Sequence, residues 1–165
     1  MKTQITITEL THEDLVNLFS TALYGSTYLS ADYTIEDKKS VGVSEDDCYE
    51  DIIAKILLSG KSIEVTDDYA EGCSYGSLPY RFQDEEDDDS SIVYRVSLED
   101  IKRGLERAAN GTFTITTKLG EDYIKEEKES ARVSFNSFAN DLLDFDLVRA
   151  DILMQIILFD EIIYG

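Results

Sequence analysis

Few residues in this chain could act as a nucleophile or a general base. The single histidine is His12, and the two thiols belong to Cys48 and Cys73. A cysteine nucleophile needs a nearby base or cation to form its thiolate, so any Cys–His pair would have to use His12. That residue lies beside Glu13 and Asp14 at the expected start of a helix, which is a surface position. Nothing in the sequence brings it to either cysteine, and we expect no enzymatic activity and no catalytic residue.

The densest group of possible metal ligands is a run of six acids, which reads Asp84, Glu85, Glu86, Asp87, Asp88 and Asp89. A calcium-binding EF-hand loop has glycine at position 6 and glutamate at position 12, whereas counting from Asp84 places Asp89 and Arg95 there. The cysteines lack zinc-like spacing, and the chain has no glycine-rich phosphate loop or dinucleotide fingerprint. The sequence therefore predicts no metal site and no cofactor.

The charge of the chain restricts its partners. Thirty-five acidic residues stand against 15 lysines and arginines in 165 residues, which gives a net charge of -20, and the first 96 residues carry -14 of it. Binding to DNA, RNA or anionic lipid relies on Lys and Arg, so direct binding to any of them is unfavourable. No apolar run reaches the roughly 18 to 20 residues of a membrane span. With only two cysteines and no signal-peptide pattern, we expect a cytoplasmic protein without membrane association.

An acidic protein-interaction module is the function that these features favour. We expect its contact with a protein partner on the run from Asp84 to Asp89, with Tyr75, Tyr80 and Tyr94 as aromatic anchors beside the run. The same tyrosines would also suit packing in a core or a hairpin. A basic nucleic-acid-binding protein is one candidate partner, because about 34 Å of B-DNA carries about 20 charges and the folded chain should be about 40 Å across. A DNA-mimic decoy of a nucleic-acid-binding or defence enzyme is thus an alternative.

Several segments have the residue spacing of amphipathic helices. We predict helices from the N-cap Thr11 to Gly25, from Tyr49 to Gly60 with Ser44 or Asp46 as the cap, and from Ser97 to Gly111. Further along the chain we predict a solvated charged stretch at 121–130 and a short helix at 135–142. The segment 152–159 is apolar nearly all round, so its helix must lie in the core or in an interface. Association through that helix, as a regulatory or assembly subunit of unknown oligomeric state, is a further alternative.

Alternating and β-branched residues indicate strands at 3–8, 62–66 and 91–96, with an extended piece at 28–33 inside a long connection. The stretches 112–118 and 161–165 also favour extended structure, and the acid run suits a hairpin tip or a mobile loop. Residues 51–65 and 151–165 share several identical positions, which leaves open a duplicated helix-strand unit or a chance match. We predict a single α+β domain over residues 1–165, in which a small mixed or antiparallel sheet is packed by about four helices.

The segment from Asp47 to Gly60, together with the closing segment from Ile157 to Gly165, resembles small acidic uncharacterised proteins of bacterial conjugative elements and phages. The resemblance covers a small part of the chain and implies no catalytic residue. It implies a bacterial, intracellular, mobile-element setting, in which acidic proteins that block restriction or other defence enzymes are known as a class. The resemblance therefore favours the decoy hypothesis without deciding it.

Overall fold

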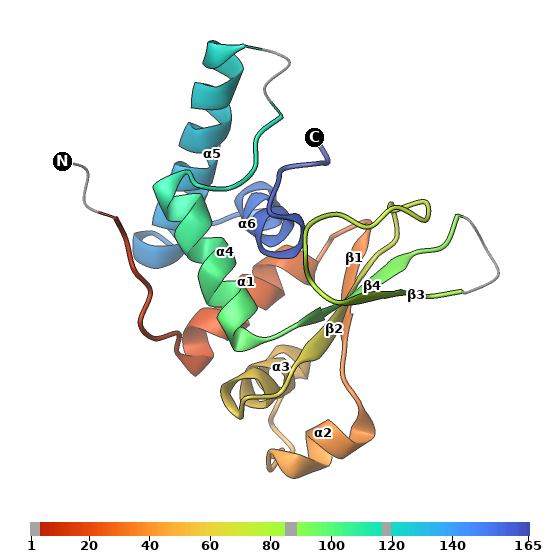
Figure 1. The fold of residues 1–165 in the computed structure, drawn as a ribbon. Coiled ribbons are helices and arrows are strands. Elements are labelled where there is room, and N and C mark those ends of the chain that lie inside the picture. The colour runs from red at the N-terminus through yellow and green to blue at the C-terminus, as the bar shows by residue number, and fades with distance from the viewer. Residues whose placement is uncertain (1–3, 85–88, 117–119) are drawn as a thin grey trace.

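Six helices and a four-stranded antiparallel sheet make up one α+β domain over the residues that the computed structural model describes, which are 4–84, 89–116 and 120–165 (Figure 1). The predicted fold class is confirmed, with an antiparallel sheet and with six helices where about four were expected. The elements in chain order are α1 (His12–Leu23), β1 (Leu29–Asp32), α2 (Ile35–Ser40), α3 (Tyr49–Leu58), β2 (Ile63–Asp67), β3 (Tyr80–Phe82), β4 (Ile92–Val96), α4 (Leu98–Asn110), α5 (Glu121–Asn140) and α6 (Leu147–Phe159).

Polar caps fix the start of the main helices, as the sequence predicts for two of them. Thr11 and Ser97 each accept the backbone N–H of the aspartate three residues on, and that aspartate accepts the cap's own N–H in return. The helix α3 begins differently from the prediction, because Cys48 takes the cap position and its backbone N–H donates to Asp51 at 3.1 Å. The expected caps Ser44 and Asp46 lie four and two residues before the observed cap.

The sheet has the strand order β1-β2-β4-β3, so β1 and β3 form its edges. Directly paired residues share a face, and the rows Val65–Tyr94–Tyr80 and Asp67–Ile92–Phe82 lie on the face that the helices cover. In Figure 1 the helices α1, α4 and α6 gather on one side of the sheet, and the β3–β4 hairpin projects away from them. The apolar face of the sheet therefore extends onto an edge strand that the helices do not reach.

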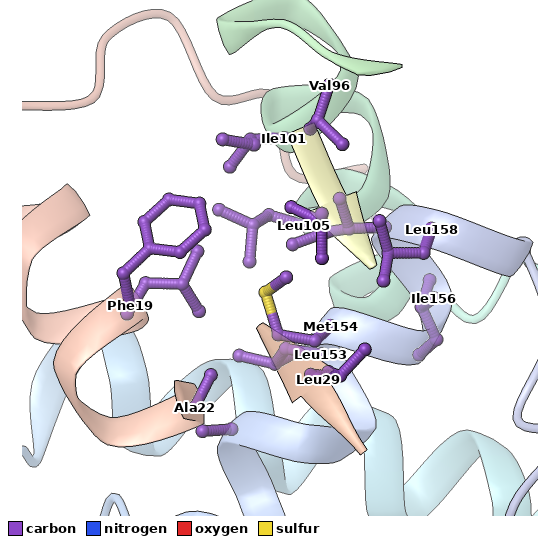
Figure 2. Packing of buried hydrophobic residues seen from close by; sticks show 14 of the residues in the cluster. Phe19, Ala22, Leu29, Val96, Ile101, Leu105, Leu153, Met154, Ile156 and Leu158 are labelled. Atoms are coloured by element: carbon purple, nitrogen blue, oxygen red, sulfur yellow. The ribbon is translucent and has the colours of Figure 1, made fainter. Parts of the chain in front are cut away.

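The helix α6 occupies the centre of the core. Its residues from Leu153 to Phe159 are all buried, and it packs against α1, α4 and α5. Figure 2 shows Leu153 and Met154 of α6 among Phe19 of α1 and Leu105 of α4. The apolar composition of this segment is thus explained by packing within one chain, which the sequence alone could not separate from packing against a second subunit.

Several predicted elements differ from the structure. The predicted strand at 3–8 is not a strand over its described residues: the N–H groups of Ile5 and Ile7 donate to the side chains of Asn110 and Glu106 on α4, at 2.8 and 2.7 Å. The helix α2 lies inside the predicted connection 26–46, and the charged stretch and the short helix expected after 120 form one continuous helix, α5. The extended stretches at 112–118 and 161–165 yield only a single bridge between Thr114 and Glu161, and 117–118 lie outside the described residues.

Candidate functional site

The acid run lies in the connection between β3 and β4, where Phe82 pairs with Ile92. The strands on either side of the run, β3 and β4, pair as an antiparallel hairpin, and the prediction for the run itself falls mostly on residues outside the described ones. The backbone N–H of Gln83 donates to the carbonyl of Ser91 at 2.9 Å, and the N–H of Asp84 donates to the Ser90 hydroxyl at 2.8 Å. These bonds hold the base of the connection closed. Of the predicted acids, Asp84 and Asp89 are described, whereas Glu85, Glu86, Asp87 and Asp88 lie outside the described residues.

Two aromatic side chains stand on the exposed edge strand next to the run. Tyr80 is 50% exposed and Phe82 is 41% exposed, and their ring centroids lie 6.0 Å apart in an edge-on arrangement. Both point to the face that carries Ile92 and Tyr94, because directly paired residues of an antiparallel pair share a face. The prediction placed Tyr80 at this position, while Phe82 was missed, although its spacing of two from Tyr80 in a strand was the available signal.

Tyr94 is not available to a partner, which corrects its prediction as a surface anchor. Its side chain is completely buried, the ring packs against Phe159 with centroids 5.6 Å apart, and its hydroxyl accepts the backbone N–H of Tyr75 at 3.0 Å. Burial raises the pKa of the Tyr94 phenol to about 12. Tyr75 is half-buried against Phe159 and Tyr164, so of the three predicted anchors Tyr80 alone is an exposed ring. A central strand of the sheet gives Tyr94 neighbours on both sides, which leaves no path to solvent.

The opposite face of the sheet carries charges of both signs. Arg81 donates to Glu64 across the strands at 2.6 Å, and Arg95 pairs with Glu64 in the strand register. Both groups of the ion pair are substantially exposed, so the pair contributes little to stability. The hairpin therefore has an aromatic face and a mixed-charge face, with the acid run at its end.

His12 and Cys48 meet at one carboxylate, a contact that no local sequence pattern predicts. His12 Nε2 lies 2.8 Å from Asp51 Oδ1, and the Cys48 thiol donates to Asp51 Oδ2 at 3.1 Å. The hydrogen bond to Asp51 raises the pKa of the Cys48 thiol, which is the opposite of what a thiolate nucleophile needs. The His12 contact is the largest cause that lowers the pKa of Asp51, to about 2. The arrangement ties the start of α1 to the start of α3 and offers no activated nucleophile.

A groove of about 630 Å³, which none of the described β3 and β4 residues lines, lies between residues 25–28, Tyr69, α5, α6 and the closing residues Ile162, Tyr164 and Gly165. We call it the tyrosine groove, because three tyrosine rings meet in its wall. Tyr28 stacks on Tyr69 with centroids 4.9 Å apart, and the edge of Tyr164 approaches Tyr28 at 5.1 Å. The sequence could not reveal this groove, since its walls come from segments more than 130 residues apart and follow no common spacing.

Carboxylates accept hydrogen bonds from the phenol hydroxyls of this tyrosine cluster. The hydroxyl of Tyr28 donates to Asp151 Oδ1, and that of Tyr164 donates to Asp67 Oδ2 at 2.7 Å. Burial and the adjacent carboxylates raise the pKa of both phenols, and burial also raises the pKa of Asp67. The other oxygen of Asp151 accepts the Gln155 amide at 2.8 Å. Each Asp151 oxygen thus accepts one protein donor and keeps a second lone-pair position.

Within 4–84, 89–116 and 120–165, no three His, Cys, Asp or Glu side chains come together as a possible metal site. No helix among these residues is both long enough and apolar enough to cross a bilayer.

The chain was also compared with known proteins. No family model, no curated protein and no solved structure matches it. The resemblance to mobile-element proteins therefore stays a prediction, and any function has to be argued from the geometry.

Proposed function

We propose that this protein is a non-enzymatic interaction module that binds a basic protein partner through the β3–β4 hairpin. The observation that carries the proposal is that the apolar face of the sheet continues past the helices onto β3, where Tyr80 and Phe82 are exposed beside the acid run. Protein interfaces combine an aromatic centre with a polar rim, and neighbouring exposed apolar side chains that form a patch mark interaction sites.

The charge of the chain supports a basic partner. Acidic residues exceed basic ones by 20, so the acids cannot each have a basic partner of their own within the chain. A partner with clustered Lys and Arg would be drawn to the hairpin by the long-range field, and the aromatic contacts would then fix its position. A DNA-mimic decoy is the more specific form of this proposal, in which the partner's basic surface is a nucleic-acid-binding groove.

The test is capture of partners on the immobilised protein from a bacterial lysate at about 0.1 M and about 1 M salt, where the screening length falls from about 10 Å to about 3 Å. The variant changes the six acids of the run to their amides, Asp→Asn or Glu→Gln. A second variant carries Tyr80→Ser and Phe82→Ser. We expect one basic protein that is retained at low salt, released at high salt, and lost in both variants.

A matched control changes six exposed acids elsewhere to their amides, so that it has the same net charge as the first variant: Glu36, Glu45, Asp46, Glu121, Asp122 and Glu126. This control should keep the partner. Equal loss in both charge variants would show that only total charge matters, and recovery of no partner would contradict the proposal. If duplex DNA displaces the captured protein, the decoy form is supported.

A further inference from the structure

The tyrosine groove continues into an exposed apolar surface at the start of α6. Leu147 and Val148 form one lip of the groove, and Val148 is 67% exposed. Leu142 and Leu143 precede them in the connection from α5 and are also exposed. Gly25, which also lines the groove, lies against this lip, because a Cβ added at Gly25 would stand 3.7 Å from Leu147 Cδ2. This combination of a groove and a contiguous apolar rim is typical of a site that binds a ligand or a partner.

Every charged side chain that lines the groove is acidic. These side chains are Asp151 and Glu127, and no Lys or Arg of the described ranges 4–84, 89–116 and 120–165 lines it. Three more exposed acids, Asp141, Asp144 and Asp146, alternate with the leucines that lead into α6. The one base in this stretch, Arg149, is already engaged: it donates to the Ser137 hydroxyl at 2.8 Å and to the carbonyl of Asp144 at 2.7 Å. Acidic residues thus outnumber basic ones by four to one over residues 141–151, which carry the apolar rim.

We propose that the tyrosine groove binds a segment of a partner protein in which Lys or Arg residues stand next to aliphatic ones. Aliphatic side chains of that segment pack on Leu147 and Val148. A cationic group reaches Asp151, where both oxygens keep a free lone-pair position, and lies near Tyr69, an exposed ring suited to a cation–π contact. A second copy of this chain is a poor occupant, because it would bring another net charge of -20 against this surface.

This inference concerns a site separate from the hairpin and stands without the hairpin proposal. The probe is a fluorescent 14-residue peptide of Leu and Lys at helical spacing, compared with the same peptide carrying Glu in place of Lys. Anisotropy gives the affinity, and a two-dimensional amide NMR titration locates the contact. We expect the Leu/Lys peptide to bind and to shift the amides of residues 25–28, Tyr69 and 147–152, while the Leu/Glu peptide does not bind.

Two variants test the two parts of the argument. The double change Leu147→Ser and Val148→Ser removes the apolar lip, and Asp151→Asn removes the charge while keeping a partner for the Tyr28 hydroxyl. Each should weaken peptide binding about tenfold, the effect of losing one central contact of an interface. The matched control is Ile35→Ser on α2, because Ile35 is also 67% exposed and also lies in the first turn of a helix. It should leave the affinity unchanged.

The location of the amide shifts and the oligomeric state of the protein decide whether the groove proposal holds. Amide shifts confined to the β3–β4 hairpin, or spread evenly over the acidic surface, would overturn the groove proposal and leave the hairpin proposal intact. Sedimentation that shows a dimer dissociated by the double variant would also overturn it, since the lip would then be a contact between copies. Amide spectra of the unbound variants establish that each is folded, so a loss of affinity cannot come from unfolding.

Discussion

Gly104 lies where α4 packs directly on α6, and the change Gly104→Ala tests how closely these helices meet. A Cβ at this position would stand 2.5 Å from Ile157 Cγ1 and 2.6 Å from Ile157 Cα. Carbon atoms are in favourable contact at about 3.5 to 4.0 Å, so the helices would have to separate by about 1 Å. Because one of the two clashing atoms belongs to the backbone, a change of the Ile157 rotamer cannot remove the clash.

The expected effect follows from two opposing terms. Overpacking a close-packed core costs about 1 to 3 kcal/mol, and the backbone clash places this change near the upper end. Alanine recovers about 1 kcal/mol in a helix, because it loses less conformational entropy than glycine. We therefore expect Gly104→Ala to lower the free energy of unfolding by about 2 kcal/mol, which corresponds to a fall in Tm of about 4 to 8 °C for a chain of this size.

Urea unfolding followed by circular dichroism measures this difference. The difference in unfolding free energy between alanine and glycine in this helix is measured separately at the neighbouring exposed residue Arg103. The comparison is between Arg103→Gly and Arg103→Ala, because both variants lack the ion pair with Asp100. Alanine should be the more stable of that pair by about 1 kcal/mol. If Gly104→Ala were also more stable than the native chain, propensity alone would govern the position, and the argument for close helix contact would be refuted.

Three pH-dependent outcomes are also expected. Because burial raises the pKa of Asp67, the folded state binds the proton of this carboxyl more tightly than the unfolded chain does, and the native chain loses stability as the pH rises above about 4. Urea unfolding over this pH range should therefore show Asp67→Asn becoming more stable relative to the native chain. Because its pKa is lowered, Asp51 stabilises the folded state above pH 3.8, the pKa in the unfolded chain, and this stabilisation is lost as the pH falls towards about 2. The change Asp51→Asn should therefore lower the free energy of unfolding at pH 6 and not at pH 2. Since burial raises the pKa of Tyr94 to about 12, absorbance at 295 nm should show phenols that ionise only well above pH 10, and stability should fall above pH 10 as the unfolded chain ionises.

The fold was predictable where local signals and burial agree. The helices α1, α3 and α4 combine apolar spacing with an acidic first turn and a glycine after the end, and all three were predicted. The helix α2 has no buried residue and is held by the cap in which Thr34 accepts the N–H of Asp37 at 3.1 Å, so it has no apolar stripe to detect. The first half of α5 is similarly charged, which hid its continuity with the buried second half.

Long-range contacts account for the remaining differences. The segment around Ile5 has strand-like residues, but its backbone pairs with the side chain of Asn110, 105 residues away, which no local pattern encodes. The dependence on long-range contacts also limits how much of the candidate sites can be predicted from the sequence. The acid run and Tyr80 were visible because they are adjacent in sequence, whereas the tyrosine groove unites Tyr28, Tyr69 and Tyr164 only after folding. The burial of Tyr94 depends on Phe159, which again lies far along the chain.

The central position of α6 has a consequence for the synthesis of this protein. Every other helix and strand is made before residue 147, yet the core that joins α1, α4 and α5 is filled by residues 153–159. At about 5 to 20 residues per second, the apolar faces of those helices stay uncovered for seconds while the chain emerges from the ribosome. Folding should therefore be completed only after residue 159 has left the exit tunnel, and until then the apolar faces of α1, α4 and α5 stay exposed on the nascent chain.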